Sequence, residues 1–120
     1  MSRGSRALWA DAAEQSPALR DFLGGHFHED TRAIYGSDET ALDQGIEALP
    51  VEQLKAILVE WCGWMNRIGW KDGEVVRALQ DGLGVNRVFR DGEDARKFMN
   101  NIYDRAIIAV RERTGSRWKP

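Results

Sequence analysis

The chain has 120 residues and a net charge of −2, with 42% hydrophobic and 30% charged side chains, which is typical of one globular domain. Its single cysteine, Cys62, excludes an internal disulfide and favours a reducing, cytoplasmic environment. No apolar run approaches the roughly 20 residues of a membrane span, and the N-terminal sequence lacks the apolar core of a signal peptide.

Charge is divided unevenly along the chain. Residues 1–60 carry 11 acidic and 5 basic side chains, whereas residues 61–120 carry 8 acidic and 12 basic ones. One interpretation is an acidic side of the surface that attracts a basic partner. Charge alone favours the other interpretation, a solvated helical surface with no partner, because the halves of a sequence need not map onto faces of the surface.

The N-terminal part predicts a flexible segment followed by a helix. Residues 1–14 form the flexible N-terminal segment. Ser16-Pro17 then marks a helix start, with serine at the N-cap and proline at the first helical position. Gly24 and Gly25 weaken this helix, because each costs about 1 kcal/mol relative to alanine. We expect them to end the helix, to bend it, or to let another helix approach.

The middle of the chain predicts three further helices. Ser37 caps the first, and Asp38 and Glu39 lie in its first turn, where acids interact favourably with the helix dipole. The segment 50–70 has the strongest helical periodicity and is expected to be the central core helix. A shorter helix is expected over residues 73–84, with Gly84 at its C-cap.

The C-terminal part predicts one long helix and a tail. In the connection before that helix, the side chains of Val88 and Phe89 are expected to be buried in the core. The helix is expected to begin after Asp91 or Gly92 and to stop at Gly115. Acidic side chains occupy its first turn and arginines its last turn, as the helix dipole favours. The tail over residues 115–120 is expected to be mobile.

No stretch shows the period-2 alternation of a β-strand, and no repeat occurs at the periods of solenoids. The sequence therefore predicts an all-α fold, a single-domain bundle of about five helices over residues 15–114.

Five tryptophans are many for this length. Trp61 fits the apolar stripe of segment 50–70, Trp64 lies near its edge and Trp70 at its end, while Trp9 is expected to dock onto the body. Packing in the core and at corners is the favoured interpretation, because large aromatic side chains bury the most area. The alternative is that some are exposed anchors for a partner.

The stretch LGGHFHEDTRAIYG, residues 23–36, combines two glycines, two histidines and an acid pair. His26 and His28 lie two positions apart, so on a helix they point in different directions and do not share a metal from one face. The chain has no further histidine for the remaining ligands of zinc, so neither a metal nor another cofactor is predicted. A metal-dependent helical enzyme centred on His26, His28, Glu29 and Asp30 is the disfavoured alternative.

Catalytic residues are not predicted either. Cys62 lies in the core helix, where cysteine is usually an inert apolar group. Glycine motifs that bind phosphate are absent. The last helix mixes basic and acidic side chains at a density typical of a solvated face. A small helical nucleic-acid-binding regulator that uses the basic C-terminal half remains the alternative function.

We interpret residues 23–36 as a structural corner. The glycines release the helix, Phe27 packs inward, and His28 and Asp30 tie the turn through hydrogen bonds to the backbone or to each other. The chain then reaches the next helix through Tyr35, Gly36 and Ser37.

The same region carries a family resemblance. Residues 22–42, FLGGHFHEDTRAIYGSDETAL, resemble the opening signature of the small helical immunity proteins of bacterial contact-dependent growth inhibition. That signature reads Leu-x-x-Phe-Leu-Gly/Ala-x-Tyr-Phe-His-Gln-Asp, followed by Tyr-Gly-Ser and an acidic helix. The matching residues are Leu19, Phe22, Leu23, Gly24, Phe27, His28, Asp30, Tyr35, Gly36 and Ser37. The family's tyrosine, glutamine and tryptophan are replaced here by His26, Glu29 and Thr31.

The resemblance implies a cytoplasmic binding protein and not an enzyme. Such a protein binds the toxic C-terminal domain of a contact-dependent growth inhibition effector and blocks its active site, without direct contact to nucleic acid or membrane. Many of these toxic domains are nucleases, which tend to be basic, so an acidic immunity surface would suit them.

The resemblance also divides the residues by role. The shared signature residues are expected to hold the fold: Phe22, Gly24, Phe27, His28, Asp30, Tyr35, Gly36 and Ser37. Toxin binding is expected from the more variable exposed acids: Glu29, Asp38, Glu39, Asp43, Glu47 and Glu52.

Overall fold

The computed structural model describes residues 8–28 and 30–120. Over these residues the chain forms seven α-helices and two short π-helical segments. In chain order they are α1 (Leu8–Glu14), α2 (Pro17–His26), α3 (Thr31–Tyr35), α4 (Asp38–Ala48), α5 (Val51–Trp64), η2 (Met65–Gly69), α6 (Asp72–Arg77), η3 (Ala78–Gly82) and α7 (Gly92–Thr114). The all-α class is confirmed, and the expected number of about five helices is too low because α1 and α3 were not predicted.

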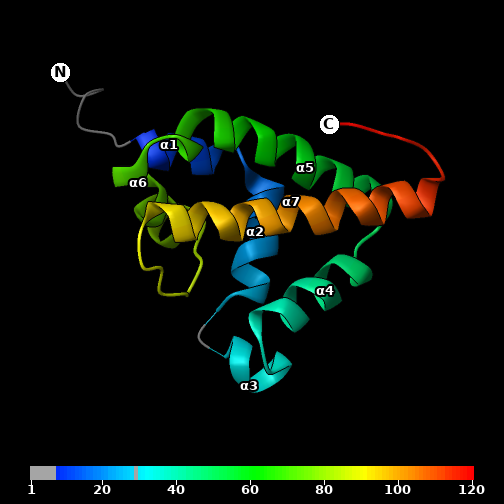
Figure 1. The fold of residues 1–120 in the computed structure, drawn as a ribbon, viewed down its shortest axis with the longest axis horizontal. Coiled ribbons are helices and arrows are strands. Elements are labelled where there is room, and N and C mark those ends of the chain that lie inside the picture. Colours follow the sequence, from blue (N-terminus) through cyan, green and yellow to red (C-terminus); the bar gives the residue numbers. More distant parts are fainter. Residues whose placement is uncertain (1–7, 29) are drawn as a thin grey trace.

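The long helices α5 and α7 pack against each other and form the body of the molecule (Figure 1). Helix α2 packs on α5 and crosses the body, so that its C-terminal end leads to α3 and α4 on one side. Helix α4 then returns towards the C-terminal half of α7 and packs on it. At the other end of the body, α1 packs on η2 and η3.

The core follows from the helical periodicity of these elements. The longer helices present apolar side chains three or four positions apart to the same side, where burial removes them from water. The fully buried core side chains include Leu19 and Leu23 of α2, Leu54 and Leu58 of α5, and Met99 of α7. None of the helices in the described part of the chain is both long and apolar enough to cross a lipid bilayer.

Three predicted helix ends are confirmed. The Ser37 hydroxyl accepts a hydrogen bond from the Thr40 amide at 3.1 Å, and the Asp91 carboxylate accepts one from the Asp94 amide at 2.9 Å. At the end of α7, Gly115 adopts a left-handed conformation with φ of 66°, which favours glycine.

The start of α2 uses a different cap from the one predicted. Proline is at the first helical position, but the Ser16 hydroxyl donates to the Ala12 carbonyl at 2.9 Å instead of accepting from the helix. The Glu60 carboxylate on α5 accepts from the Leu19 amide at 2.9 Å and supplies the cap. A helix terminus can therefore be satisfied by a side chain 41 residues away.

Within the segment expected to be flexible, residues 8–14 form helix α1. Ala12 and Ala13 of α1 are buried, and Trp9 packs against the core, as expected. A Cβ on Gly82 would lie 3.2 Å from the Trp9 carbonyl oxygen, so glycine allows α1 to lie close to η3.

The C-terminal tail lies against the body of the protein. Trp118 packs against the core, and its carbonyl accepts a hydrogen bond from Arg111 Nε at 3.2 Å. The Lys55 ammonium lies 5.5 Å from the centre of the Trp118 ring, within range of a cation–π contact. These contacts place the tail beside α5 and α7.

Two further core predictions need correction. Phe89 is buried but Val88 is 88% exposed, because consecutive residues of an extended connection point in opposite directions.

Trp64 was predicted at the edge of the apolar stripe but is fully buried. Trp61 is half-buried and donates from its indole nitrogen to the Met99 carbonyl at 2.7 Å. Trp70 is 69% exposed at the end of the segment.

Candidate functional site

The histidine-containing corner between α2 and α3 is held by local hydrogen bonds. The Thr31 hydroxyl donates to the His26 carbonyl at 2.7 Å and accepts from the His28 amide at 2.9 Å. The His28 ring accepts from the Asp30 amide at 3.1 Å. Phe27 is 1% exposed and packs edge-on against Phe98, with ring centres 5.0 Å apart. This geometry is that of a structural corner.

The two histidines serve different contacts. His26 donates through Nδ1 to the Phe22 carbonyl at 2.9 Å, and its ring lies between the rings of Phe22 and Tyr35. The His28 ring instead accepts the Asp30 amide hydrogen bond within the turn. Within residues 8–28 and 30–120, no group of three His, Cys, Asp or Glu side chains is arranged to hold a metal ion.

Thr31 stands where the resembling family has tryptophan. Thr31 is 4% exposed and is, with Ser16, a buried polar residue among those described, and both of its hydrogen bonds stay within the corner. The position therefore fixes the fold here and presents no aromatic surface to a partner.

The acids predicted to bind a toxin fall into two groups, apart from Glu29, which lies outside the described residues. Asp38 pairs with Arg87 at 2.8 Å, and Asp43 pairs with Arg105. The remaining acids, Glu39, Glu47 and Glu52, are exposed, and Asp43 is also exposed despite its pairing.

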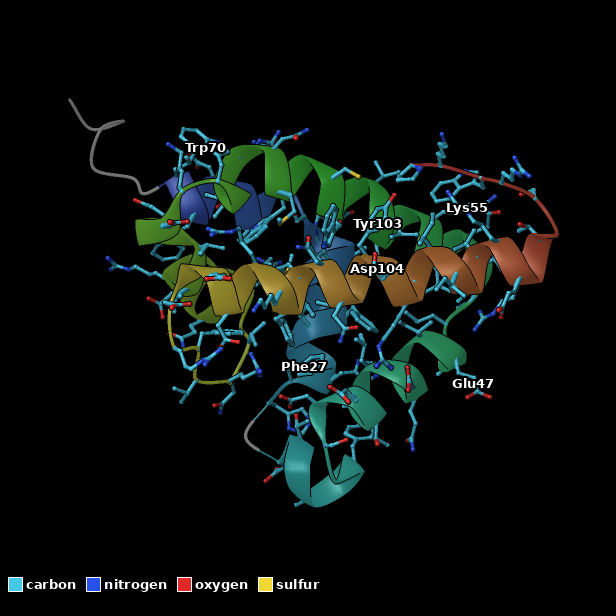
Figure 2. All side chains as sticks on the ribbon, viewed as in Figure 1. Phe27, Glu47, Lys55, Trp70, Tyr103 and Asp104 are labelled. Carbon is cyan, nitrogen blue, oxygen red and sulfur yellow. The ribbon has the colours of Figure 1, made fainter. Side chains whose placement is uncertain are left out.

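The exposed acids differ in their surroundings. Glu52, at the start of α5, lies 3.7 Å from Lys55 and is 86% exposed, so this ion pair is weak. Glu39 and Glu47, on α4, form no hydrogen bond or ion pair through their carboxylates with the described part of the chain. Figure 2 shows Glu47 pointing away from the body of the protein.

Three arginines from the basic half of the chain hold α4 in place. Arg87 and Arg105 form the ion pairs with Asp38 and Asp43. Arg113 donates to the carbonyls of Leu49, Ile46 and Glu47 at 2.6, 3.1 and 3.3 Å. These carbonyls lie at the C-terminal end of α4, which carries the negative end of the helix dipole. The Ile46 carbonyl also accepts from the Leu49 amide at 3.2 Å.

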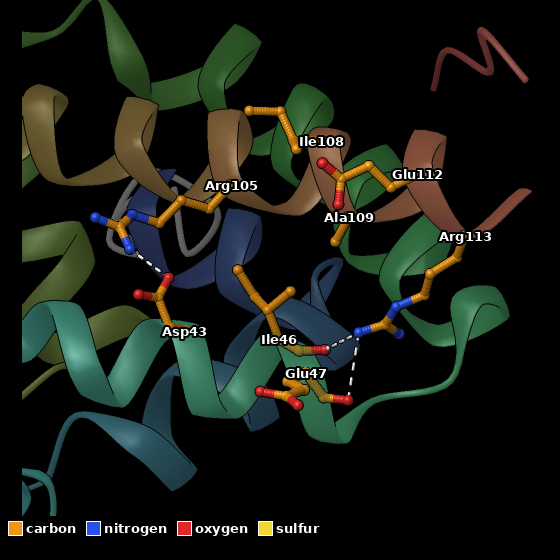
Figure 3. Close-up of a pocket in the computed structure, with 8 residues that line it drawn as sticks. All are labelled: Asp43, Ile46, Glu47, Arg105, Ile108, Ala109, Glu112 and Arg113. Atoms are coloured by element: carbon orange, nitrogen blue, oxygen red, sulfur yellow. Dashed lines mark hydrogen bonds and ion pairs between the residues drawn. The ribbon is translucent and has the colours of Figure 1, made fainter. Parts of the chain in front are cut away.

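A groove of about 300 Å³ lies between α4 and the C-terminal half of α7. We call it the α4–α7 groove (Figure 3), and it is lined by Asp43, Ile46, Glu47, Arg105, Ile108, Ala109, Glu112 and Arg113. Apolar side chains from both helices form a strip along it, and Ile108 is 54% exposed there. Figure 3 shows Glu47 on α4 and Glu112 on α7, the two helices that border the groove.

Sequence analysis missed the α7 side of this groove. Ile107 and Ile108 are consecutive, and on a helix two consecutive side chains do not share a face. Ile107 is 6% exposed and belongs to the core, which leaves Ile108 outside it. The adjacent isoleucines, with Glu112 one helical turn after Ile108, were the sequence signal that could have indicated this exposed face of α7.

Cys62 does not have the surroundings of a catalytic nucleophile. The side chain is half-buried, and burial raises the pKa of its thiol above the usual value. A raised pKa keeps the sulfur protonated, whereas a nucleophilic cysteine requires the thiolate.

Comparison with protein-family models, curated proteins and solved structures finds no match to this chain. The geometry described above is therefore the basis for interpreting the site. Its principal features are a self-contained corner, an arginine-anchored α4, and a groove that carries exposed acids and an exposed isoleucine.

Proposed function

We propose that this protein is a toxin-neutralising immunity protein of the contact-dependent growth inhibition type. It acts in the cytoplasm as a stoichiometric inhibitor and not as an enzyme. It binds the C-terminal toxic domain of an effector, most simply a nuclease, and covers the active site of that domain. The proposal combines the resemblance of residues 22–42 with the surface that α4 presents.

The observation that carries the proposal is the exposed acidic side of α4. Arg87 and Arg105 pair with Asp38 and Asp43 of this helix, and Arg113 donates to carbonyls at its end. The carboxylates of Glu39 and Glu47 lie on the same face as Asp43 and have no ion-pair partner within the described residues. A basic nuclease surface would supply these partners, and complementary charge would accelerate the encounter.

The alternative of a nucleic-acid-binding regulator has less support. It requires the arginines of the C-terminal half to be available for phosphates. Arg87, Arg96 and Arg105 instead pair with acids, and Arg113 is directed at the carbonyls of α4.

Co-expression with the toxic domain encoded immediately upstream of this gene tests the proposal. We expect the chain to restore growth to cells that produce the toxic domain, and to co-purify with it as one stable complex. Continued killing without a complex would contradict the proposal, as would the absence of a toxic domain at that position. A band shift with DNA or RNA that weakens with salt would then favour the regulator.

A further inference from the structure

We propose that the α4–α7 groove is the docking site for a basic segment of the toxic domain. This segment lays an apolar side chain on the strip around Ile108 and places a lysine or arginine between Glu47 and Glu112. The inference rests on the proposed function. It extends the binding surface from α4 to α7, a helix that carries none of the acids expected to bind toxin.

The apolar part of the groove is an incomplete contact. Ile46 is 6% exposed and forms the floor, whereas Ile108 is 54% exposed on the neighbouring helix. Covering Ile108 with an apolar side chain would remove its surface from water, which favours association.

The charges of the groove select a basic occupant. Asp43 already pairs with Arg105, and Arg113 directs its donors to the negative end of α4. Glu47 and Glu112 are left exposed, and neither carboxylate has a partner among the residues described here. A lysine or arginine between them would interact with two carboxylates, whereas an acidic side chain would be repelled by both.

The walls of the groove are fixed before any partner arrives. The Asp43–Arg105 pair joins α4 to α7 at one end, and the contacts of Arg113 join them at the other (Figure 3). A groove that is already formed loses little conformational freedom on binding, so more of the contact energy appears as affinity.

Binding of a catalytically inactive form of the upstream toxic domain, measured by surface plasmon resonance, tests the inference. We expect Ile108→Arg to raise Kd by about 100-fold, because it adds bulk and positive charge at the centre of the contact. Glu47→Lys and Glu112→Lys should each raise Kd by about tenfold, mainly by slowing association.

Matched controls separate the groove from general surface effects. Val59 on α5 is 53% exposed, close to the 54% of Ile108, so Val59→Arg makes the same change outside the groove. Asp21→Lys reverses an exposed acid on α2. Both controls should change Kd by less than about threefold, because isolated exposed positions contribute little. Thermal melting of every variant checks that each one folds.

The outcomes distinguish the inference from the proposed function. If the wild-type chain neither rescues growth nor binds the toxic domain, the proposed function fails and the inference fails with it. If the wild type binds but the groove variants match their controls, the inference alone fails. The inference is also overturned if the wild-type chain forms a dimer that Ile108→Arg dissociates while toxin affinity is unchanged, since the groove would then hold a second copy.

Discussion

Gly45 is a single residue on which the approach of α4 to α2 depends. A Cβ at this position would lie 2.9 Å from ring atoms of both His26 and Phe22. Phe22 is 5% exposed, and moving the His26 ring would strain its hydrogen bond to the Phe22 carbonyl, so an added Cβ would disturb both rings. The absence of a side chain therefore sets the distance between the two helices.

We expect Gly45→Ala to lower the free energy of unfolding by about 1–3 kcal/mol, because overpacking outweighs the better helix propensity of alanine. Gly25→Ala is the matched control, since nothing lies within 4 Å of a Cβ there. That variant should raise stability by up to about 1 kcal/mol. Urea denaturation measures both, and a stabilised Gly45→Ala would refute the packing argument.

Asp94 is a second residue with a specific local role, at the start of α7. Its carboxylate accepts a hydrogen bond from the Arg90 amide at 3.0 Å. This bond lowers its pKa from the usual 3.8, and the nearby charges of Arg87, Arg90 and Lys97 act in the same direction. A lowered pKa in the folded state means that the ionised form stabilises the fold.

We therefore expect the stabilisation from Asp94 to be complete above its usual pKa of 3.8 and to be lost as pH falls through its lower folded value. Asp94→Asn should be less stable than the wild type at neutral pH, and the difference should shrink in strong acid. Thermal melting of both proteins across this range is the measurement. A difference that does not depend on pH would show that the charge plays no part.

At the scale of elements, the ends of the helices are completed by distant side chains. Glu60 of α5 caps the start of α2, and Arg113 of α7 caps the end of α4. An acid lies at an N-terminus and a cation at a C-terminus, which is the arrangement that the helix dipole favours. These caps fix how helices lie relative to one another as well as where they end.

We expect Arg113→Met to lower the free energy of unfolding by about 1–3 kcal/mol, because the carbonyls at the end of α4 lose charged donors while the aliphatic stem is kept. Hydrogen exchange should become faster in the last turn of α4 and stay unchanged in α2. Arg113→Lys should recover part of the loss, since an ammonium keeps the charge without the planar set of donors. Equal exchange rates in wild type and Arg113→Met would contradict this role.

At the scale of the whole molecule, the acidic and basic halves of the chain are joined to each other. Asp38 and Arg87 are 49 residues apart, and Asp43 and Arg105 are 62 apart. Part of the charge imbalance seen in the sequence is therefore used inside the protein. The exposed acids that remain on α4 and α7 make the surface available to a basic partner.

We expect salt to affect binding more than folding. The paired side chains are about one-third exposed or more, so each ion pair contributes at most about 1 kcal/mol and its loss changes stability little. Raising the salt concentration from about 0.05 M to about 0.5 M should slow association with the toxic domain by tenfold or more and leave dissociation nearly unchanged. Stopped-flow kinetics and thermal melting at both concentrations measure the two effects. Association that does not depend on salt would contradict electrostatic steering.

Local sequence determined the all-α class, the three longest helices and several of their ends. Periodicity of apolar residues and capping side chains act over a few positions, so Ser37, Asp91 and Gly115 were identified from the sequence. The helices α1 and α3 were missed because they have 7 and 5 residues, too few for a periodic pattern. Helices of that length form only when the rest of the protein packs on them.

The tertiary structure decided which of the predicted acids are available. Composition indicated an acidic first half, but Asp38 and Asp43 could not be separated from Glu39 and Glu47 without the positions of arginines far along the chain. The α4–α7 groove likewise joins two helices whose lining residues lie about half the chain apart. Local patterns reflect interactions within a few residues, whereas ion pairs, distant caps and grooves depend on how whole helices pack, and for this reason only the folded molecule specified the candidate site.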